Sequence, residues 1–213
     1  TNKKFIATKC GDTKSIELAM SQNRSIEFKR ANQLYGEKQF IPAAEAFYRY
    51  YKTAPATDAD LPIALYNSAV AYKLGDRPKT AISMFKEFTA NKDKRFRESP
   101  FFLDAMRLTA LSYQGAFEYD KAISTYLELY DTAKKAQKLG IKAPEPLPGE
   151  KPLTLNQIAL DSLFNAAFAA ELNRDFKRAI DLYKRYETEE SDRAKKDAAV
   201  WSVAGIYRSS GDA

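Results

Sequence analysis

Residues 69–85 read AVAYKLGDRPKTAISMF, and this stretch decides the fold because its spacing recurs along the chain. Ala69 is followed twelve residues later by Ala81, and Phe85 comes four residues after Ala81. An apolar-periodic segment, a break at residues 75–78 and a second apolar-periodic segment are typical of two helices joined by a short turn. The stretch therefore predicts a helical hairpin.

Four segments share this pattern without internal gaps: residues 31–47, 69–85, 110–126 and 167–183. The paired alanines are Ala31 and Ala43, Ala69 and Ala81, Ala110 and Ala122, and Ala167 and Ala179. The aromatics are Phe47, Phe85, Tyr126 and Tyr183, followed three residues later by Tyr50, Phe88, Leu129 and Tyr186. We expect the alanines to lie where the two helices come closest and the rings to be buried, each ring contributing about 2–3 kcal/mol. The pattern predicts a repeat of hairpins.

The second alanines of the units are about 38, 41 and 57 residues apart, which is more than a plain hairpin array needs. Loops around residues 54–57 and 96–100 explain the first two spacings. A second helix extended to Gly140 and a proline-rich stretch at residues 142–153 explain the third. We interpret that stretch as an insertion between repeats; the alternative is a recognition segment for another domain.

These boundaries predict seven segments. They are an N-terminal helical cap or degenerate repeat at 1–24, repeats at 25–57, 58–99 and 100–141, the proline-rich loop at 142–153, a repeat at 154–191, and the first helix of a truncated repeat at 192–213. Two interpretations of the N-terminus stay open: a turn at Cys10 in an earlier hairpin, or one long helix from Thr13 to about Gly36. A chain that starts at Thr1 and stops at Ala213 is expected to be a section of a longer protein.

The amino-acid composition limits the classes of function that the chain can have. Hydrophobic residues make up 45% and charged residues 29%, as in a soluble globular protein, and no apolar run is long enough to span a membrane. The chain has no histidine, which excludes Ser-His-Asp and Cys-His nucleophile pairs and removes the commonest metal ligand. Cys10 is the only cysteine, so no disulfide can form within the chain and we expect a spare thiol. No cofactor or metal is predicted.

The repeat resembles the tetratricopeptide repeat (TPR) family over roughly residues 25–213. The resemblance rests on LYNSAVAYKLGD at residues 65–76, EYDKAI at 118–123 and DFKRAIDLY at 175–183. The chain departs from the family pattern in its long spacings, in lacking the closing proline of most units (Pro55 is the exception), and in Ala170, where the other units have Leu34, Tyr72 or Tyr113.

The resemblance implies an all-α, right-handed α-solenoid of antiparallel hairpins whose concave face holds a protein or peptide. The residues that it places on that face are Tyr66, Val70, Lys73, Arg107, Leu111, Gln114, Phe164, Phe168, Glu171 and Trp201. The alternative is that Phe164, Phe168 and Trp201 pack between hairpins. A family subclass clamps terminal carboxylates with Lys, Asn and Arg; Asn32 and Asn67 match it, but Phe28, Asp104 and Leu108 replace its basic positions, which excludes that ligand.

The predicted function is a non-catalytic protein-interaction scaffold, one section of a larger TPR protein that organises a multiprotein complex, in a bacterial envelope (periplasm) or motility machine. No small-molecule substrate is expected. One alternative is a polyanion surface, for nucleic acid or anionic lipid, made by Lys134, Lys135, Lys138, Lys142 and Lys151; the net charge of +6 favours it, but the scattered cations do not. The other is an α-solenoid hydrolase using Asp104 and Asp161, for which no phosphate loop or zinc motif is present.

Overall fold

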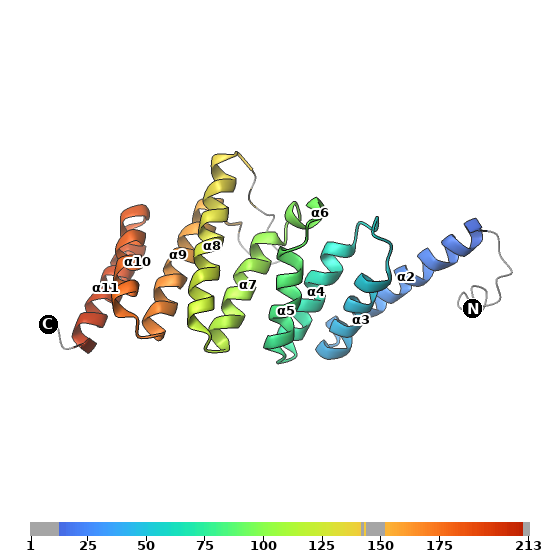
Figure 1. Ribbon diagram of the computed structural model, residues 1–213, viewed down its shortest axis with the longest axis horizontal. Coiled ribbons are helices and arrows are strands. Elements are labelled where there is room, and N and C mark those ends of the chain that lie inside the picture. Colours follow the sequence, from blue (N-terminus) through green and yellow to red (C-terminus); the bar gives the residue numbers. More distant parts are fainter. Residues whose placement is uncertain (1–12, 142, 144–151, 211–213) are drawn as a thin grey trace. The chain divides into compact units, whose positions relative to one another are not determined.

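Helices make up all of the regular structure that the computed structural model describes, which covers residues 13–141, 143 and 152–210 (Figure 1). The helices are α2 (Thr13–Gly36), α3 (Phe40–Thr53), α4 (Leu61–Leu74), α5 (Pro78–Thr89), α6 (Lys94–Arg97), α7 (Phe102–Gly115), α8 (Tyr119–Lys138), α9 (Leu155–Leu172), α10 (Phe176–Glu189) and α11 (Arg193–Ser210). The predicted all-α class is confirmed. None of the helices in these ranges is both long and apolar enough to cross a bilayer.

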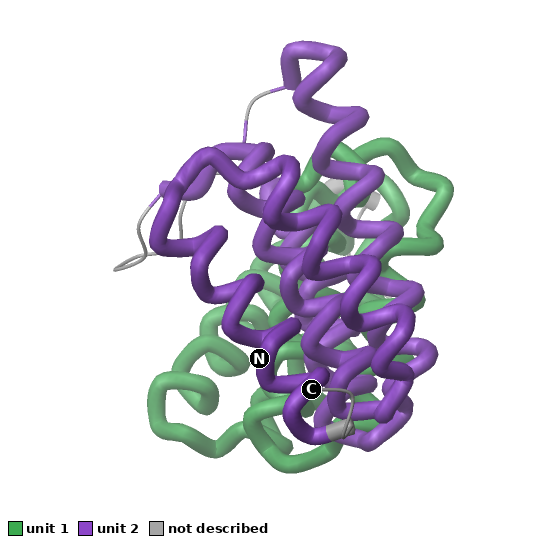
Figure 2. The backbone as a smooth tube through the Cα atoms, turned by 90° about the vertical axis from the view of Figure 1, so that its left-hand side faces the viewer, with its two compact units in different colours: residues 1–99 green, residues 100–213 purple. Residues whose placement is uncertain are grey.

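The chain divides into two compact units, residues 1–99 and residues 100–213 (Figure 2). In unit 1, α2 pairs with α3 and α4 pairs with α5, and α3 packs on α4. In unit 2, α7 pairs with α8 and α9 pairs with α10, while α8 packs on α9 and α11 packs on α10. Each unit is thus a stack of antiparallel helical hairpins.

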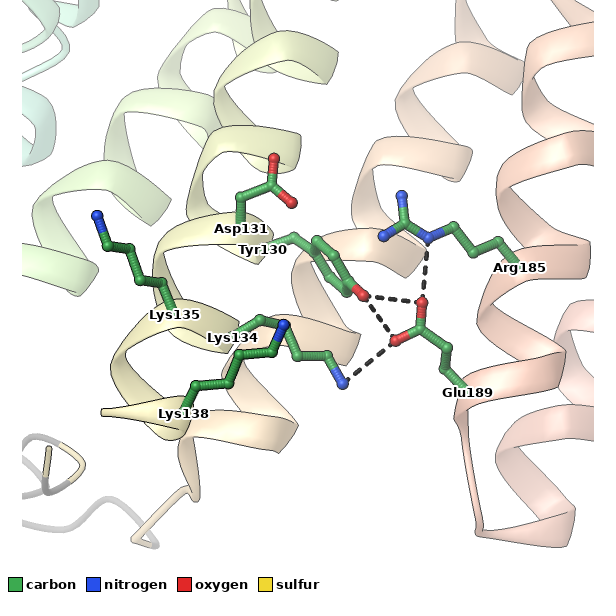
Figure 3. A pocket seen from close by; sticks show the side chains of 7 residues that line it. All are labelled: Tyr130, Asp131, Lys134, Lys135, Lys138, Arg185 and Glu189. Atoms are coloured by element: carbon green, nitrogen blue, oxygen red, sulfur yellow. Dashed lines mark hydrogen bonds and ion pairs between the residues drawn. The ribbon is translucent and has the colours of Figure 1, made fainter. Parts of the chain in front are cut away.

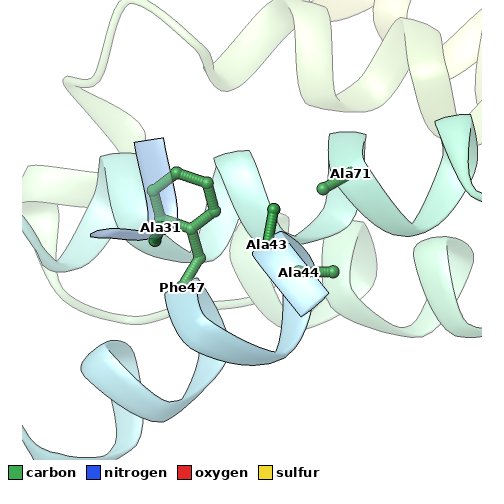
Figure 4. Close-up of a cluster of buried hydrophobic side chains, with 5 residues drawn as sticks. All are labelled: Ala31, Ala43, Ala44, Phe47 and Ala71. Atoms are coloured by element: carbon green, nitrogen blue, oxygen red, sulfur yellow. The ribbon is translucent and has the colours of Figure 1, made fainter. Parts of the chain in front are cut away.

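The eight repeat alanines are all fully buried, with 0% of their surface exposed. In unit 1, Ala31 of α2, Ala43 and Ala44 of α3, and Ala71 of α4 pack with Phe47 in one cluster (Figure 4). The repeat aromatics and the large residues three positions later are buried as well. Small side chains let the backbones of paired helices approach closely, and the rings fill the space beside them. The predicted register is therefore confirmed in all four hairpins.

The turn inside each hairpin has the same backbone geometry. In the first, the N–H of Gln39 donates to the carbonyl of Leu34 at 2.9 Å, and Lys38 before it takes a left-handed conformation with φ of 60°. Asp76, Phe117 and Arg174 occupy the same place in the other three turns, with φ of 56°, 60° and 60°. This is the hydrogen-bonding pattern of a Schellman helix end, which usually has glycine at the left-handed position. None of the four residues here is glycine.

A short helix, α6, is inserted in the connection between α5 and α7. Arg95 of α6 donates through Nη1 to the carbonyl of Asp58 at 2.7 Å, which ties the helix to the α3–α4 loop. Phe96 is buried, and its ring lies 5.2 Å from that of Phe88. The extra residues of this connection therefore add to the core of unit 1.

The structure also bears on the open features of the sequence. Residues 13–36 form one long helix, while the alternative turn at Cys10 lies outside the described residues. The second helix of the third repeat is extended as predicted but ends at Lys138. A further helix, α11, follows α10, and its assignment as the first helix of another repeat stays a prediction. Most of the proline-rich stretch at 142–153 lies outside the described residues, and the segment boundaries as a whole stay predictions.

Candidate protein-binding surface

Nine of the ten residues predicted for the concave face lie on the first helix of a hairpin, and Trp201 lies on α11, which packs on α10. Tyr66, Val70 and Lys73 are on α4 of unit 1. The other seven belong to unit 2: Arg107, Leu111 and Gln114 on α7, Phe164, Phe168 and Glu171 on α9, and Trp201 on α11. Successive units of a repeat present equivalent positions on the same side. The residues of unit 2 are therefore candidates for one surface.

Two of the predicted residues, Tyr66 and Phe164, belong to clusters of three aromatic rings inside their hairpins. Three residues before the first repeat alanine, three hairpins carry an aromatic side chain: Phe28, Tyr66 and Phe164. Each ring packs edge-on against two rings of its own second helix. The ring centroids are 5.5 and 5.0 Å from Phe47 and Tyr50 for Phe28, 6.1 and 6.2 Å from Phe85 and Phe88 for Tyr66, and 5.3 and 5.1 Å from Tyr183 and Tyr186 for Phe164.

These clusters change the interpretation of Tyr66 and Phe164. Tyr66 is only 5% exposed, and Phe164 is half-buried. Edge-to-face ring pairs stabilise a fold by about 0.5–1.5 kcal/mol beyond the area that they bury. Both residues therefore help to hold their own hairpin together, and whether they also contact a partner stays a prediction.

Two polar candidates serve as acceptors for buried tyrosines. The hydroxyl of Tyr126 donates to Oε1 of Gln114 at 3.2 Å, and that of Tyr183 donates to Oε2 of Glu171 at 2.9 Å. Burial raises the pKa of Tyr126 to about 12, and burial together with the Glu171 hydrogen bond raises the pKa of Tyr183. A buried hydroxyl needs such a partner. Gln114 and Glu171 thus stabilise the hairpins.

The other two hairpins support this conclusion by contrast. Where the second helix carries Phe47 or Phe85, the ring has no hydroxyl to satisfy. The matching first-helix positions are then Tyr35 and Lys73, neither of which is a carboxylate or an amide. Lys73 is half-buried, as are Val70 and Leu111. The pairing of residue types could have been found in the sequence by comparing these two positions across the four repeats.

Arg107 is the exception among the repeats. It occupies the position that carries a ring in the other three hairpins, and its side chain is exposed. Its Nε donates to Oδ1 of Asp104 at 2.8 Å. In the α7–α8 hairpin, Tyr126 and Leu129 are buried although no third ring occupies this position.

Two apolar candidates are exposed. Phe168 on α9 is 38% exposed and Trp201 on α11 is 71% exposed. Phe168 lies at the repeat position of Leu111, one residue after the first alanine. Large aromatic side chains left exposed to water are candidates for contacts in a protein-binding surface.

The carboxylates considered for hydrolysis have separate cationic partners. Asp104 pairs with Arg107, and Oδ1 of Asp161 lies 3.9 Å from Nζ of Lys195. Burial raises the pKa of Asp161 above its ordinary value. In the part of the chain that the structure describes, no three Cys, Asp or Glu side chains are grouped so that they could hold a metal ion.

The lysines of the polyanion alternative are not equivalent. Lys134 donates to Oδ1 of Asn156 at 2.9 Å and lies 3.2 Å from Glu189. Lys135 and Lys138 are exposed. Lys142 and Lys151 lie outside the described residues. One member of the predicted set is therefore held by partners within the fold, and two are exposed.

Comparison with known proteins identifies the fold. No protein-family model and no curated relative matches the chain. The solved structure of nearly identical TPR-like repeats, from a kinesin light chain of Podosopora anserina, matches with a TM-score of 0.57 at 17% identity, covering 88% of this chain and 87% of that one. BtubC (BKLC) from P. vanneervenii matches with a TM-score of 0.57 at 15% identity, covering 99% of this chain and 79% of that one. With the four hairpins in register, these matches show that the chain folds as a TPR-like α-solenoid.

Proposed function

We propose that this chain is a protein-binding scaffold and that unit 2 binds a peptide or helix of a partner through Arg107, Phe168 and Trp201. The observation that carries the proposal is the identity of Arg107. The other hairpins place a structural ring at this position, whereas this hairpin is packed without one and leaves an exposed cation there. The TPR-like fold supports the same conclusion, because hairpin stacks of this kind expose a long surface on their first helices.

The ligand suited to these side chains is an extended or amphipathic segment with apolar anchors. Phe168 and Trp201 offer ring surface, and large aromatic residues supply much of the binding energy at protein interfaces. Arg107 is already paired with Asp104, so the two side chains present a donor and an acceptor side by side. We expect Arg107 and Asp104 to orient the partner and to contribute little to its affinity, because exposed ion pairs contribute little binding energy.

The broader proposal is that the chain is one section of a larger TPR protein that organises a multiprotein complex. Its placement in a bacterial envelope or motility machine stays a prediction from the sequence. A non-catalytic role is consistent with a chain that has no histidine.

The test combines capture of a partner with fluorescence. Protein captured from the native lysate by the wild-type chain should be lost with a Phe168→Ala, Trp201→Ala double variant and reduced with Arg107→Glu. Because Trp201 is the only tryptophan, its emission should shift to shorter wavelength when the captured partner, once purified, is added back.

Phe117→Ala is the matched control, because Phe117 is a 77% exposed ring of unit 2 in the α7–α8 turn. It should leave capture unchanged. If Phe117→Ala reduced capture as much as the double variant, the captured protein would be binding nonspecifically to exposed aromatic rings. If Arg107→Glu unfolded the chain in thermal melting, Arg107 would be structural and the proposed surface would be misplaced.

A further inference from the structure

A hollow surface lies between α8 and α10, which are the second helices of the two hairpins of unit 2. It consists of two adjoining hollows of about 460 and 450 Å³ that share Asp131 and Lys135. We call this surface the α8–α10 groove. Its lining residues are Ser124, Leu127, Glu128, Tyr130, Asp131, Thr132, Lys134, Lys135 and Lys138 from α8, and Arg178, Arg185 and Glu189 from α10.

One end of the groove already binds a carboxylate, that of Glu189 (Figure 3). The Tyr130 hydroxyl donates to its two oxygens at 2.8 and 2.6 Å, and Nε of Arg185 donates at 3.0 Å. Nζ of Lys134 lies 3.2 Å away. Burial raises the pKa of Glu189, but these hydrogen bonds outweigh it, so the pKa lies below its ordinary value. The donors of both helices are thus arranged around a negative charge.

Two exposed cations of the groove have no such side-chain partner in the part of the chain that the structure describes. The ammonium groups of Lys135 and Lys138 form no hydrogen bond or ion pair with any residue in those ranges. Both lie in the last turn of α8, where the helix dipole favours positive charge. Figure 3 shows both lysines on the same helix as Lys134, which reaches Glu189. They are exposed positions at which this groove can accept further negative charge.

The pattern of charges favours a peptide over a nucleic acid. The lining carries five cations and three carboxylates, and on α8 the carboxylates Glu128 and Asp131 precede the three lysines, so the groove has both repulsive and attractive positions. A phosphate backbone carries a charge at every step and would meet Glu128 and Asp131. A peptide can place acidic residues opposite Lys135 and Lys138 and neutral ones elsewhere. From Ser124 to Lys138 the groove follows about 20 Å of helix, which matches about six extended residues.

We propose that the α8–α10 groove binds an acidic segment of a partner protein, with Lys135 and Lys138 as its main contacts. Glu189 holds Arg185 and Lys134 in place beside them. This surface is on the second helices and is separate from the first-helix residues of the proposed scaffold function. Either proposal can therefore fail without the other.

The test uses a fluorescently labelled hexapeptide with glutamate at its first and third positions and glutamine elsewhere, the acidic probe, and fluorescence anisotropy at a salt concentration of about 0.15 M, where loose charge attraction is screened. Hexaglutamine and a thymidine oligonucleotide with six phosphates serve as neutral and nucleic-acid probes. We expect the acidic probe to bind more tightly than either. A Lys135→Glu, Lys138→Glu double variant should weaken its binding by about tenfold or more.

The matched control is the double variant Lys177→Glu, Lys184→Glu. Both lysines are exposed on α10 and do not line the groove, and replacing them gives the same change in net charge. It should change binding of the acidic probe by less than about twofold. Circular dichroism of both double variants checks that they fold. Three results would overturn the proposal: no binding of the acidic probe to the wild type, equal losses in the two double variants, or an oligonucleotide that binds as tightly as the peptide.

Discussion

The left-handed residues of the four turns differ in how well their side chains suit that conformation. Asp76 has a short polar side chain, and aspartate is among the residues that adopt a left-handed backbone most readily. Phe117 is bulky and 77% exposed, so little packing offsets its strain; its ring lies edge-on to that of Tyr119, with the centroids 6.2 Å apart. The same turn therefore costs a different amount of free energy in each hairpin.

Replacing Phe117 with glycine should stabilise unit 2. Glycine adopts positive φ without steric cost, so Phe117→Gly should raise the free energy of unfolding by about 0.5–1 kcal/mol after the loss of the Tyr119 contact. Chemical denaturation measures the change, and Asp76→Gly should give a smaller one. A fall in stability for Phe117→Gly would mean that the ring makes a stabilising contact.

Removing a single hydroxyl should test the acceptor role of Glu171. Tyr183→Phe leaves that half-buried carboxylate without its 2.9 Å donor and should destabilise the chain by about 1–2 kcal/mol. Tyr126→Phe, whose acceptor is the neutral Gln114, should cost less, about 1 kcal/mol. Urea unfolding of both variants gives the comparison. Equal costs, or a stabilised Tyr183→Phe, would contradict the proposed difference between a charged and a neutral acceptor.

At the scale of helices, the alanine register could be predicted because it depends on residues close in sequence. Ala122 and Ala179 recur at fixed intervals, and a small residue at a close helix contact has few substitutes. The rings on the first helices were harder to place. The burial of Tyr66 depends on whether Phe85 and Phe88 reach it across the hairpin, and helical periodicity alone does not give that distance.

The α8–α10 groove was missed for a related reason. The basic end of α8 is visible in the sequence, but its hollow also needs Arg185 and Glu189, which lie on another hairpin. Which faces of α8 and α10 meet depends on how α9 packs between them. The sequence does not decide whether α2 is one long helix, because no residue between Thr13 and Gly36 is a strong helix breaker or a strong signal of continuation.

Overpacking one alanine should weaken the contact between paired helices. Ala179→Leu, or Ala122→Leu in the preceding hairpin, should lower the free energy of unfolding by about 1–3 kcal/mol because a fully buried site has no room for the added atoms. Ala198→Leu on α11 is the control, since Ala198 is exposed and leucine is also a good helix former. Thermal melting should separate them, and an unchanged Ala179→Leu would refute the register.

For the whole chain, stability should change little with pH between about 6 and 8, with Tm varying by less than about 2 °C, because no histidine titrates there. On the acid side, hydrogen bonds outweigh burial and lower the pKa of Glu189 and Glu190. Their contribution is complete above the unfolded-state pKa, near 4.5, and is lost as the pH falls through the folded value.

The alkaline side should show the opposite direction of change. Burial raises the pKa of Tyr50 and of Tyr126 to about 12, whereas an unfolded tyrosine titrates near 10. Their contribution is complete below pH 10 and is lost as the pH rises through 12. Melting curves from pH 3 to 12 test both limbs. A transition centred near neutral pH would reveal a titrating group that these residues do not account for.

Tyr183 and its acceptor Glu171 lie on the two helices of a single hairpin. This arrangement affects how such a protein can change over evolutionary time. A point substitution at Tyr183 or Glu171 strands the other member, so each intermediate is less stable than either end state. Duplication or exchange of the whole hairpin passes both members on together. Hairpins with the polar pair and hairpins with a plain phenylalanine should therefore be inherited as intact blocks, and mixed forms should be rare among descendants.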